Sequence, residues 1–180
     1  MKYVLLILPV LCIQLCSAQD SNQIQGTAIK NHGITYQIES PDLILETSKK
    51  YKVIFDIAKT AEKNDQLNSS INTIARFINM HVLQGVPLEN LEVVAVIHGG
   101  AVKDYTSNEV YFKKYGVNNP NIELIKELKE VGVQTYMCGQ SFTYHGYKKE
   151  QLSEHANLAL SAMTALVYFQ EEGYQIINFN

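Results

Sequence analysis

Apolar and polar residues alternate along the chain in blocks that predict strands and helices in turn from residue 51 onward. Two stretches, YKVIFDIA at 51–58 and LEVVAVIH at 91–98, are almost continuously apolar, as expected of strands buried on both faces. A helix is predicted over 68–84, because apolar residues recur there at helical spacing until Gly85 stops it. Further strands are predicted at 133–138, 156–160 and 174–179, and further helices at 119–131 and 161–172.

Residues that favour helix ends mark the boundaries of the two later helices. Asn119 and Pro120 fit the N-cap and the first helical position of one, and Gly132 fits its end. Ser161 fits the N-cap of the other, which Gly173 ends.

This alternation predicts an α/β fold with a mostly parallel five-stranded sheet and helices on both faces, because parallel neighbours need crossover connections. Ligands of such folds bind outside the carboxyl ends of the strands. Three features gather at that edge. They are Asp56, the run His98-Gly99-Gly100, and the run Cys138-Gly139-Gln140-Ser141.

The first 18 residues have the composition of a secretory signal peptide. Lys2 precedes an apolar stretch, and small residues end at Ala18, so Gln19 is expected to be the first mature residue. The alternative is a lipid anchor on Cys16. Cleavage predicts a periplasmic or secreted protein that has no membrane segment after the signal is removed. Residues 19–50 then form a polar N-terminal extension, with a hairpin expected around Ser40-Pro41-Asp42.

The cysteine count follows from this prediction. The chain has three cysteines, and removal of residues 1–18 leaves only Cys138, which cannot form a disulfide within the chain. The 15 basic and 18 acidic residues form no basic cluster, which argues against nucleic-acid binding.

Five segments together identify a resemblance to a known family. These are YKVIFDIA, VVAVIHGGAV, IKELKEVGV, QTYMCGQS and EEGYQIINF, and in this order they resemble the DsrE/DsrF-like proteins, in particular exported single-domain members. The resemblance covers residues 51–180 and implies a flavodoxin-like sheet and a homo-oligomer, often a trimer or hexamer. Cytoplasmic relatives carry sulfur as a persulfide on a cysteine, and Cys138 is the cysteine that corresponds. Export makes a tRNA-directed relay implausible.

Two interpretations of Cys138 stay open. As a sulfur carrier or thiol-exchange site it would be exposed and reactive, with the amides around Gly139, Gln140 and Ser141 available to the sulfur. As the last buried residue of its strand it would be structural, and the chain would be a non-enzymatic small-ligand or protein-binding module. The donor and acceptor of the sulfur cannot be named from the residues.

His98 is a weaker candidate for a base or a thiolate-stabilising group, and the alternative is a structural histidine. With strand order 2-1-3, His98 and Cys138 would be two strands apart, about 10 Å, which is long for contact. Gly99 and Gly100 predict a tight turn at the pocket rim. His145 follows in a loop that either covers the thiol or packs on a neighbouring subunit.

No cofactor and no metal site is predicted. Neither a dinucleotide fingerprint nor a phosphate-binding loop is present, and the histidines lack the spacing of zinc ligands. The aromatic residues of segments 105–115 and 142–147 are expected to bury apolar surface between subunits.

Overall fold

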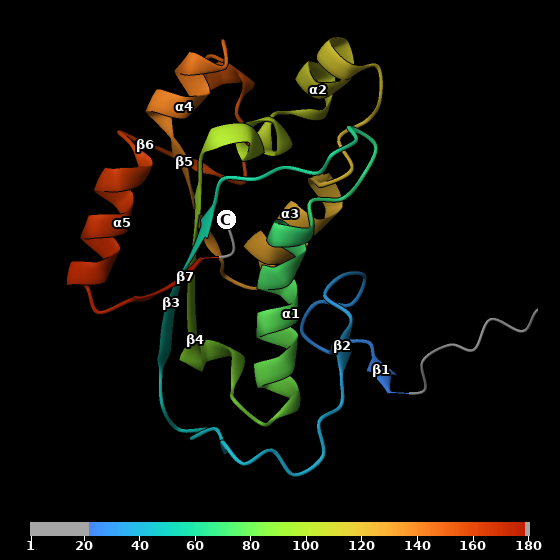
Figure 1. The fold of residues 1–180 in the computed structure, drawn as a ribbon, viewed down its shortest axis with the longest axis vertical. Coiled ribbons are helices and arrows are strands. Elements are labelled where there is room, and N and C mark those ends of the chain that lie inside the picture. Colours follow the sequence, from blue (N-terminus) through green and yellow to red (C-terminus); the bar gives the residue numbers. More distant parts are fainter. Residues whose placement is uncertain (1–21, 179–180) are drawn as a thin grey trace, which may run out of the picture.

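The computed structural model describes residues 22–178, in which five parallel strands form a sheet with helices on both faces (Figure 1). The spatial order of the strands is β6-β5-β4-β3-β7. The predicted α/β class and all five predicted strands are confirmed, with ends that differ by at most one residue. The strands are β3 (Tyr51–Ile57), β4 (Leu91–Ile97), β5 (Gln134–Cys138), β6 (Asn157–Ala159) and β7 (Gln175–Asn178).

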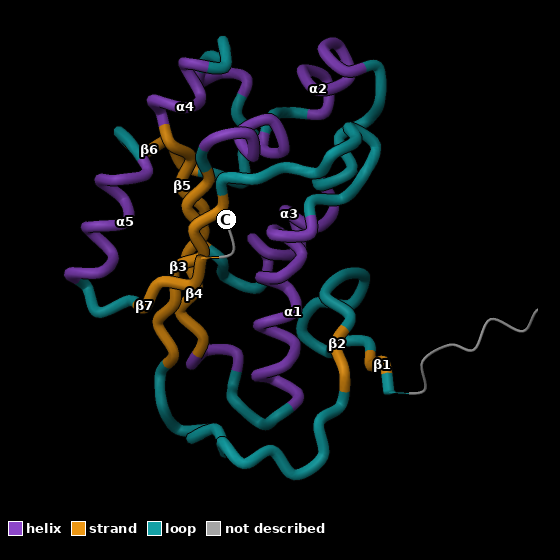
Figure 2. Tube along the Cα trace, in the orientation of Figure 1, coloured by secondary structure: helices purple, strands orange, loops and turns teal. Residues whose placement is uncertain are grey.

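Three helices cover the sheet. Figure 2 shows the sheet nearly edge-on, with α1 and α3 on one side and α5 on the other. The bounds are α1 (Ser69–Leu83), α3 (Ile122–Glu130) and α5 (Ala162–Glu171). Two short helices that the pattern did not predict, α2 (Asn108–Tyr115) and α4 (Gly139–Tyr144), lie at the carboxyl end of the sheet. Short 3₁₀ turns are found at Leu88–Asn90, Gly99–Tyr105 and Lys149–Gln151.

Alternation along the strands divides the core into two layers. On β3, Phe55 and Ile57 pack in the layer that contains residues of α1 and α3, whereas Ile54 packs in the layer beneath α5. Cys138 belongs to the α5 layer. The apolar runs found in the sequence therefore correspond to strands covered from both sides.

The assumed strand order 2-1-3 is wrong. β4 pairs with both β3 and β5, so the second and third predicted strands are neighbours. The reason is that the crossovers through α1 and α3 lie on the same face, so the chain steps in one direction from β3 to β6. It returns through α5 on the other face and places β7 beside β3. The connections thus diverge between β3 and β7.

The N-caps of α1 and α3 differ in how they are formed. Asn68 caps α1, and its side chain accepts hydrogen bonds from the amides of Ser70 and Ile71. The expected cap Asn119 lies before the helix, because α3 begins after Asn121. The buried Asn119 side chain instead donates to the carbonyls of Asp104 and Thr106, so a tertiary role replaces the local one.

The N-terminal extension packs on α1, on the side away from the sheet (Figure 1). Its strands β1 (Gln23–Ile24) and β2 (Thr35–Tyr36) pair antiparallel across the segment 25–34. The hairpin expected around Ser40-Pro41-Asp42 is wrong, because that region bends without pairing and Ser40 has a φ of 53°. The predicted signal peptide lies outside the described residues.

No helix between residues 22 and 178 has the length and hydropathy needed to cross a bilayer.

Candidate functional site

Cys138 lies at the junction of β5 and α4. It ends the strand and is the N-cap of the helix, where its sulfur accepts a hydrogen bond from the amide of Ser141 at 3.4 Å. The residue is only 4% exposed and packs beside Ala162 and Ala165 of α5. The exposed thiol expected of a carrier is therefore not found in the single chain, although Gln140 beside it is exposed.

Hydrogen bonds to the sulfur favour its ionised form. Burial raises the pKa of the Cys138 thiol, but the Ser141 hydroxyl and the amides of Ser141, Ala162 and Gln140 lower it by more, so the pKa lies below its ordinary value. Ala162 is the first residue of α5, and Gln140 and Ser141 are in the first turn of α4. Amides at the starts of two helices therefore converge on one sulfur.

Gly139 and Gly99 lie where the backbone approaches a neighbouring carbonyl oxygen too closely for a side chain. A Cβ on Gly139 would lie 2.7 Å from the carbonyl oxygen of Ala159, at the end of β6. Gly99 has a φ of +53°, and a Cβ there would lie 2.9 Å from the carbonyl oxygen of Ala58. Gly100 has ordinary van der Waals space around it, with Thr60 at 3.4 Å.

The turn after β4 contacts the cysteine helix through Ser141. The amide of Gly99 donates to the Ser141 hydroxyl oxygen at 3.3 Å. That turn is itself fixed by the buried Asp104, whose carboxylate accepts hydrogen bonds from Thr60 at 2.9 Å and Asn68 at 2.7 Å. Burial raises the pKa of Asp104, while these hydrogen bonds lower it. The sequence reasoning missed this network, which has no local signature.

His98 and Cys138 lie at neighbouring strand ends. β4 and β5 pair in register up to Ile97 and Met137, so His98 and Cys138 occupy the next positions along the two strands, on the α5 face. The expected two-strand separation is therefore wrong. The His98 ring forms a hydrogen bond with Asp56, between Nε2 and Oδ1 at 2.8 Å.

Asp56 also accepts a hydrogen bond from Asn178 at 2.8 Å, from β7 on its other side. The cluster Asp56, His98 and Asn178 thus spans three adjacent strands and includes the switch between β3 and β7. Because a carboxylate accepts, Nε2 of a neutral His98 carries the proton, and Nδ1 is the acceptor of the ring. Asn178 was not identified from the sequence, since an asparagine at the end of a strand carries no signal of its own.

The remaining candidates are less central. His145 is the exposed C-cap of α4, at the opposite end of the helix from Cys138, so it does not cover the sulfur. The aromatic residues of the two segments divide into two groups: Tyr105, Tyr111, Phe142 and Tyr147 are buried within the chain, whereas Phe112 and Tyr144 are exposed. The buried rings pack within the chain, for example Phe142 on Tyr147, whereas the exposed rings remain accessible, so the contact between subunits stays a prediction.

Among residues 22–178, no group of three or more histidine, cysteine or acidic side chains is arranged to hold a metal ion. The candidate site contains the Cys138 thiol, the amides around it and the Asp56–His98 pair.

Comparisons with known proteins match the part of the chain that forms the five-stranded sheet and its helices. The sequence model of the DsrE/DsrF-like family matches residues 49–179. Among solved structures, MTH1491 from Methanobacterium thermoautotrophicum, a protein of unknown function, has 19% identity and a TM-score of 0.52. The ychN protein of E. coli has 13% identity and a TM-score of 0.53. Each comparison covers 72% of this chain and 99% of the other, and shows a shared fold. No curated protein sequence matches the chain.

Proposed function

Because the chain belongs to the DsrE/DsrF-like family, we propose that Cys138 carries a sulfur atom as a persulfide. The observation that supports this most directly is the set of donors around the sulfur, which come from Ser141, Ala162 and Gln140 and lower its pKa. A thiolate is the form of cysteine that attacks sulfur. A buried cysteine with only a packing role has no need of these donors.

Loading is a thiol exchange that needs no outside oxidant. The Cys138 thiolate attacks a sulfur atom of a polysulfide, a new S–S bond forms, and the old S–S bond breaks with its electron pair on the shorter polysulfide. Delivery reverses the roles: an acceptor thiolate attacks the outer sulfur, and the Cys138 thiolate leaves.

The Asp56–His98 pair has a role in delivery. An acceptor thiol must lose its proton before it attacks. Nε2 of His98 is bonded to Asp56, so Nδ1 is the ring nitrogen that can accept this proton. His98 directly follows β4, and β4 is the neighbour of β5, the strand that Cys138 ends. We assign His98 as the base for the acceptor and Asp56 as the residue that orients its ring.

The proposed setting is outside the cytoplasm, as an exported homo-oligomer. The signal-like segment at residues 1–18 supports export, and the family resemblance supports assembly. The donor and acceptor would then be small sulfur compounds or protein thiols of that compartment.

A second function has one observation in its favour. Cys138 is 4% exposed, which fits a structural cysteine in a binding module. Under that alternative the thiol resists reagents until the protein unfolds, whereas a carrier's thiol reacts in the folded protein.

Intact-mass measurement after incubation with polysulfide separates the two. A carrier gains one sulfur mass per chain, loses it on reduction, and gains none as Cys138→Ser. Iodoacetamide labelling of the native protein, followed by labelling in denaturant, provides the second readout. A thiol that reacts only in denaturant and takes up no sulfur would establish the structural alternative.

A further inference from the structure

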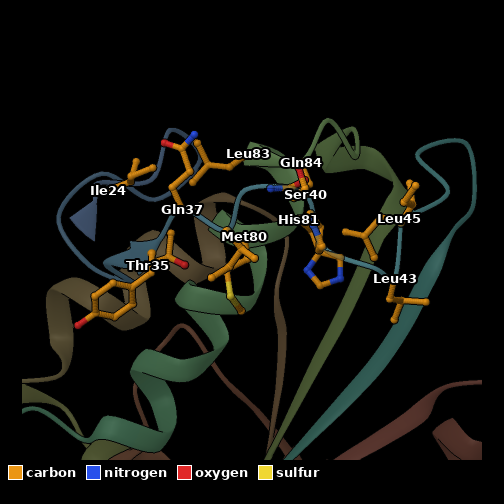
Figure 3. A pocket seen from close by; sticks show the side chains of 14 residues that line it. Ile24, Thr35, Gln37, Ser40, Leu43, Leu45, Met80, His81, Leu83 and Gln84 are labelled. Carbon is orange, nitrogen blue, oxygen red and sulfur yellow. The ribbon is translucent and has the colours of Figure 1, made fainter. Parts of the chain in front are cut away.

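A cavity of about 740 Å³ lies between the N-terminal extension and the carboxyl-terminal end of α1. Its wall includes Leu43 and Leu45 from the extension and Met80 and Leu83 from α1 (Figure 3). Ile38 of the extension also lines it. It is formed at the end of α1 that leads into β4, whereas Cys138 lies at the carboxyl ends of the strands. The site is therefore separate from the thiol and does not depend on the proposed sulfur chemistry.

The extension is anchored on both sides of the cavity. Before it, the amide of Gln37 donates to the carbonyl of Asn22 at 3.1 Å. After it, the carbonyl of Glu46 accepts from the Tyr51 hydroxyl at 3.1 Å. The segment between these anchors nevertheless presents large apolar side chains to solvent, with Leu43 82% and Ile44 83% exposed. Apolar exposure on an anchored segment beside a cavity marks a binding surface.

The cavity is uncharged. Among the described residues that line it, none is aspartate, glutamate, lysine or arginine, and its polar members include Thr35, Gln37 and Ser40. Burial of an ion in such surroundings is unfavourable because no opposite charge compensates for the lost water. The lining therefore selects a neutral molecule.

His81 supplies a single directional acceptor. Its Nδ1 lies 2.8 Å from the carbonyl oxygen of Phe77, and a carbonyl only accepts, so Nδ1 carries the proton. Burial lowers the pKa of His81, although the Phe77 hydrogen bond raises it, so the ring is neutral at pH 7 and Nε2 accepts. The rings of Tyr51 and Phe77 hold the imidazole in place, and Figure 3 shows it between Met80 and the leucines of the extension.

We propose that this cavity binds a neutral, largely apolar small molecule that donates one hydrogen bond to Nε2 of His81. The volume lies within the range of sites that enclose drug-sized ligands. Hydroxylated or N–H-bearing aromatic and polycyclic compounds have this chemistry.

The test is a fluorescence titration with N-phenyl-1-naphthylamine, a neutral probe with one N–H. The wild-type protein is expected to bind it saturably, with one site per chain. Leu83→Trp fills the cavity and weakens binding at least about tenfold, whereas Phe112→Trp, at an exposed position of α2, changes it less than about twofold. Ile38→Asp, at an exposed position that tolerates substitution, weakens binding by placing a charge in the cavity.

A second pair of probes tests the hydrogen bond. His81→Phe keeps the ring packing and removes the acceptor, so it weakens N-phenyl-1-naphthylamine roughly threefold to tenfold, the range of one net hydrogen bond. Binding of 1-phenylnaphthalene, which has no N–H, is unchanged by the same substitution. Equal affinity for the anionic 1-anilinonaphthalene-8-sulfonate would overturn the requirement for neutrality. The proposal fails if the wild-type protein shows no saturable binding, or if Leu83→Trp alters only the oligomeric state, which would make the cavity a contact between copies.

Discussion

The amide of Gly99 donates to the hydroxyl oxygen of Ser141 at 3.3 Å, and this contact joins the turn after β4 to the helix that Cys138 caps. Because the Ser141 oxygen accepts there, its own proton is free to be donated to the sulfur. Burial raises the Cys138 pKa, and among the groups that lower it the Ser141 hydroxyl has the largest effect. The residues near His98 therefore influence the thiol without touching it.

Ser141→Ala should raise the pKa of Cys138. Because its pKa is lowered, Cys138 stays ionised at pH values at which an unfolded cysteine is protonated. Removal of the Ser141 hydroxyl should therefore move the protonation of the thiolate to higher pH. Iodoacetamide labelling at pH 7 is expected to slow roughly threefold to tenfold, the range of one net hydrogen bond. Gln140→Ala is the control, because it keeps the backbone amide that bonds the sulfur. Identical pH profiles for wild type and Ser141→Ala would contradict the assigned hydrogen bond.

His98→Gln should slow sulfur delivery without preventing loading. The Cys138 thiolate needs no base, whereas the acceptor thiol does, so transfer to a small thiol should fall by roughly a hundredfold, the lower end of general-base effects. The measurement is the loss of the added sulfur mass over time. His145→Gln, at the far end of α4, should leave the rate unchanged. Equal rates for the two variants would remove His98 from the reaction.

The fold could be predicted because its signals are local. Apolar runs such as 91–98 specify buried strands, and Ser161 caps the helix that follows it, as predicted. Strand order could not be predicted in this way, since it depends on which face each crossover takes. The assumed order placed β3 between His98 and Cys138, whereas β3 lies on the other side of β4 from β5.

The site was predicted in part for a similar reason. Cys138, His98 and Asp56 each lie at or beside the end of a strand, which the sequence indicates, but the Asp56–His98 contact requires the register of two strands. Tyr105 and Tyr111 were assigned to an interface because their neighbours are polar. They are buried instead, because the short helix α2 and the turn before it fold over the end of the sheet.

Gly139→Ala should destabilise the protein. The added methyl group would lie 2.7 Å from the Ala159 carbonyl oxygen, and a backbone atom cannot move as a flexible side chain can. We expect a loss of about 1–3 kcal/mol, typical of overpacking, in urea unfolding followed by circular dichroism. Gly100→Ala is the matched control, since its nearest contact is 3.4 Å and its φ is not left-handed. A loss of the same size at both positions would show that close approach is not the cause.

Asn79→Ala should release the N-terminal extension. The fully buried side chain donates to the carbonyls of Ile29, His32 and Gly33 and accepts from the amide of Ile29. Leaving these groups without a partner is expected to cost about 2–3 kcal/mol in the free energy of unfolding. Asn90→Ala, which removes one hydrogen bond from a half-buried asparagine, should cost less than about 1 kcal/mol. Proteolysis of the extension in Asn79→Ala, at a rate above that of the control, would locate the effect.

Self-association is expected through the outer face of α5. Among the described helices, α5 covers its side of the sheet alone, and Met163 and Val167 on it are exposed together with Leu160 before it. Apolar exposure of this extent marks an interaction surface. Val167→Asp should therefore reduce the mass measured by light scattering toward that of one chain, since a carboxylate buried at a contact has no partner. Phe112→Asp on α2, also exposed, should leave the assembly intact. If the unmodified protein is a monomer at micromolar concentration, the α5 face has another partner; if Phe112→Asp alone dissociates the assembly, the contact lies at the carboxyl end of the sheet.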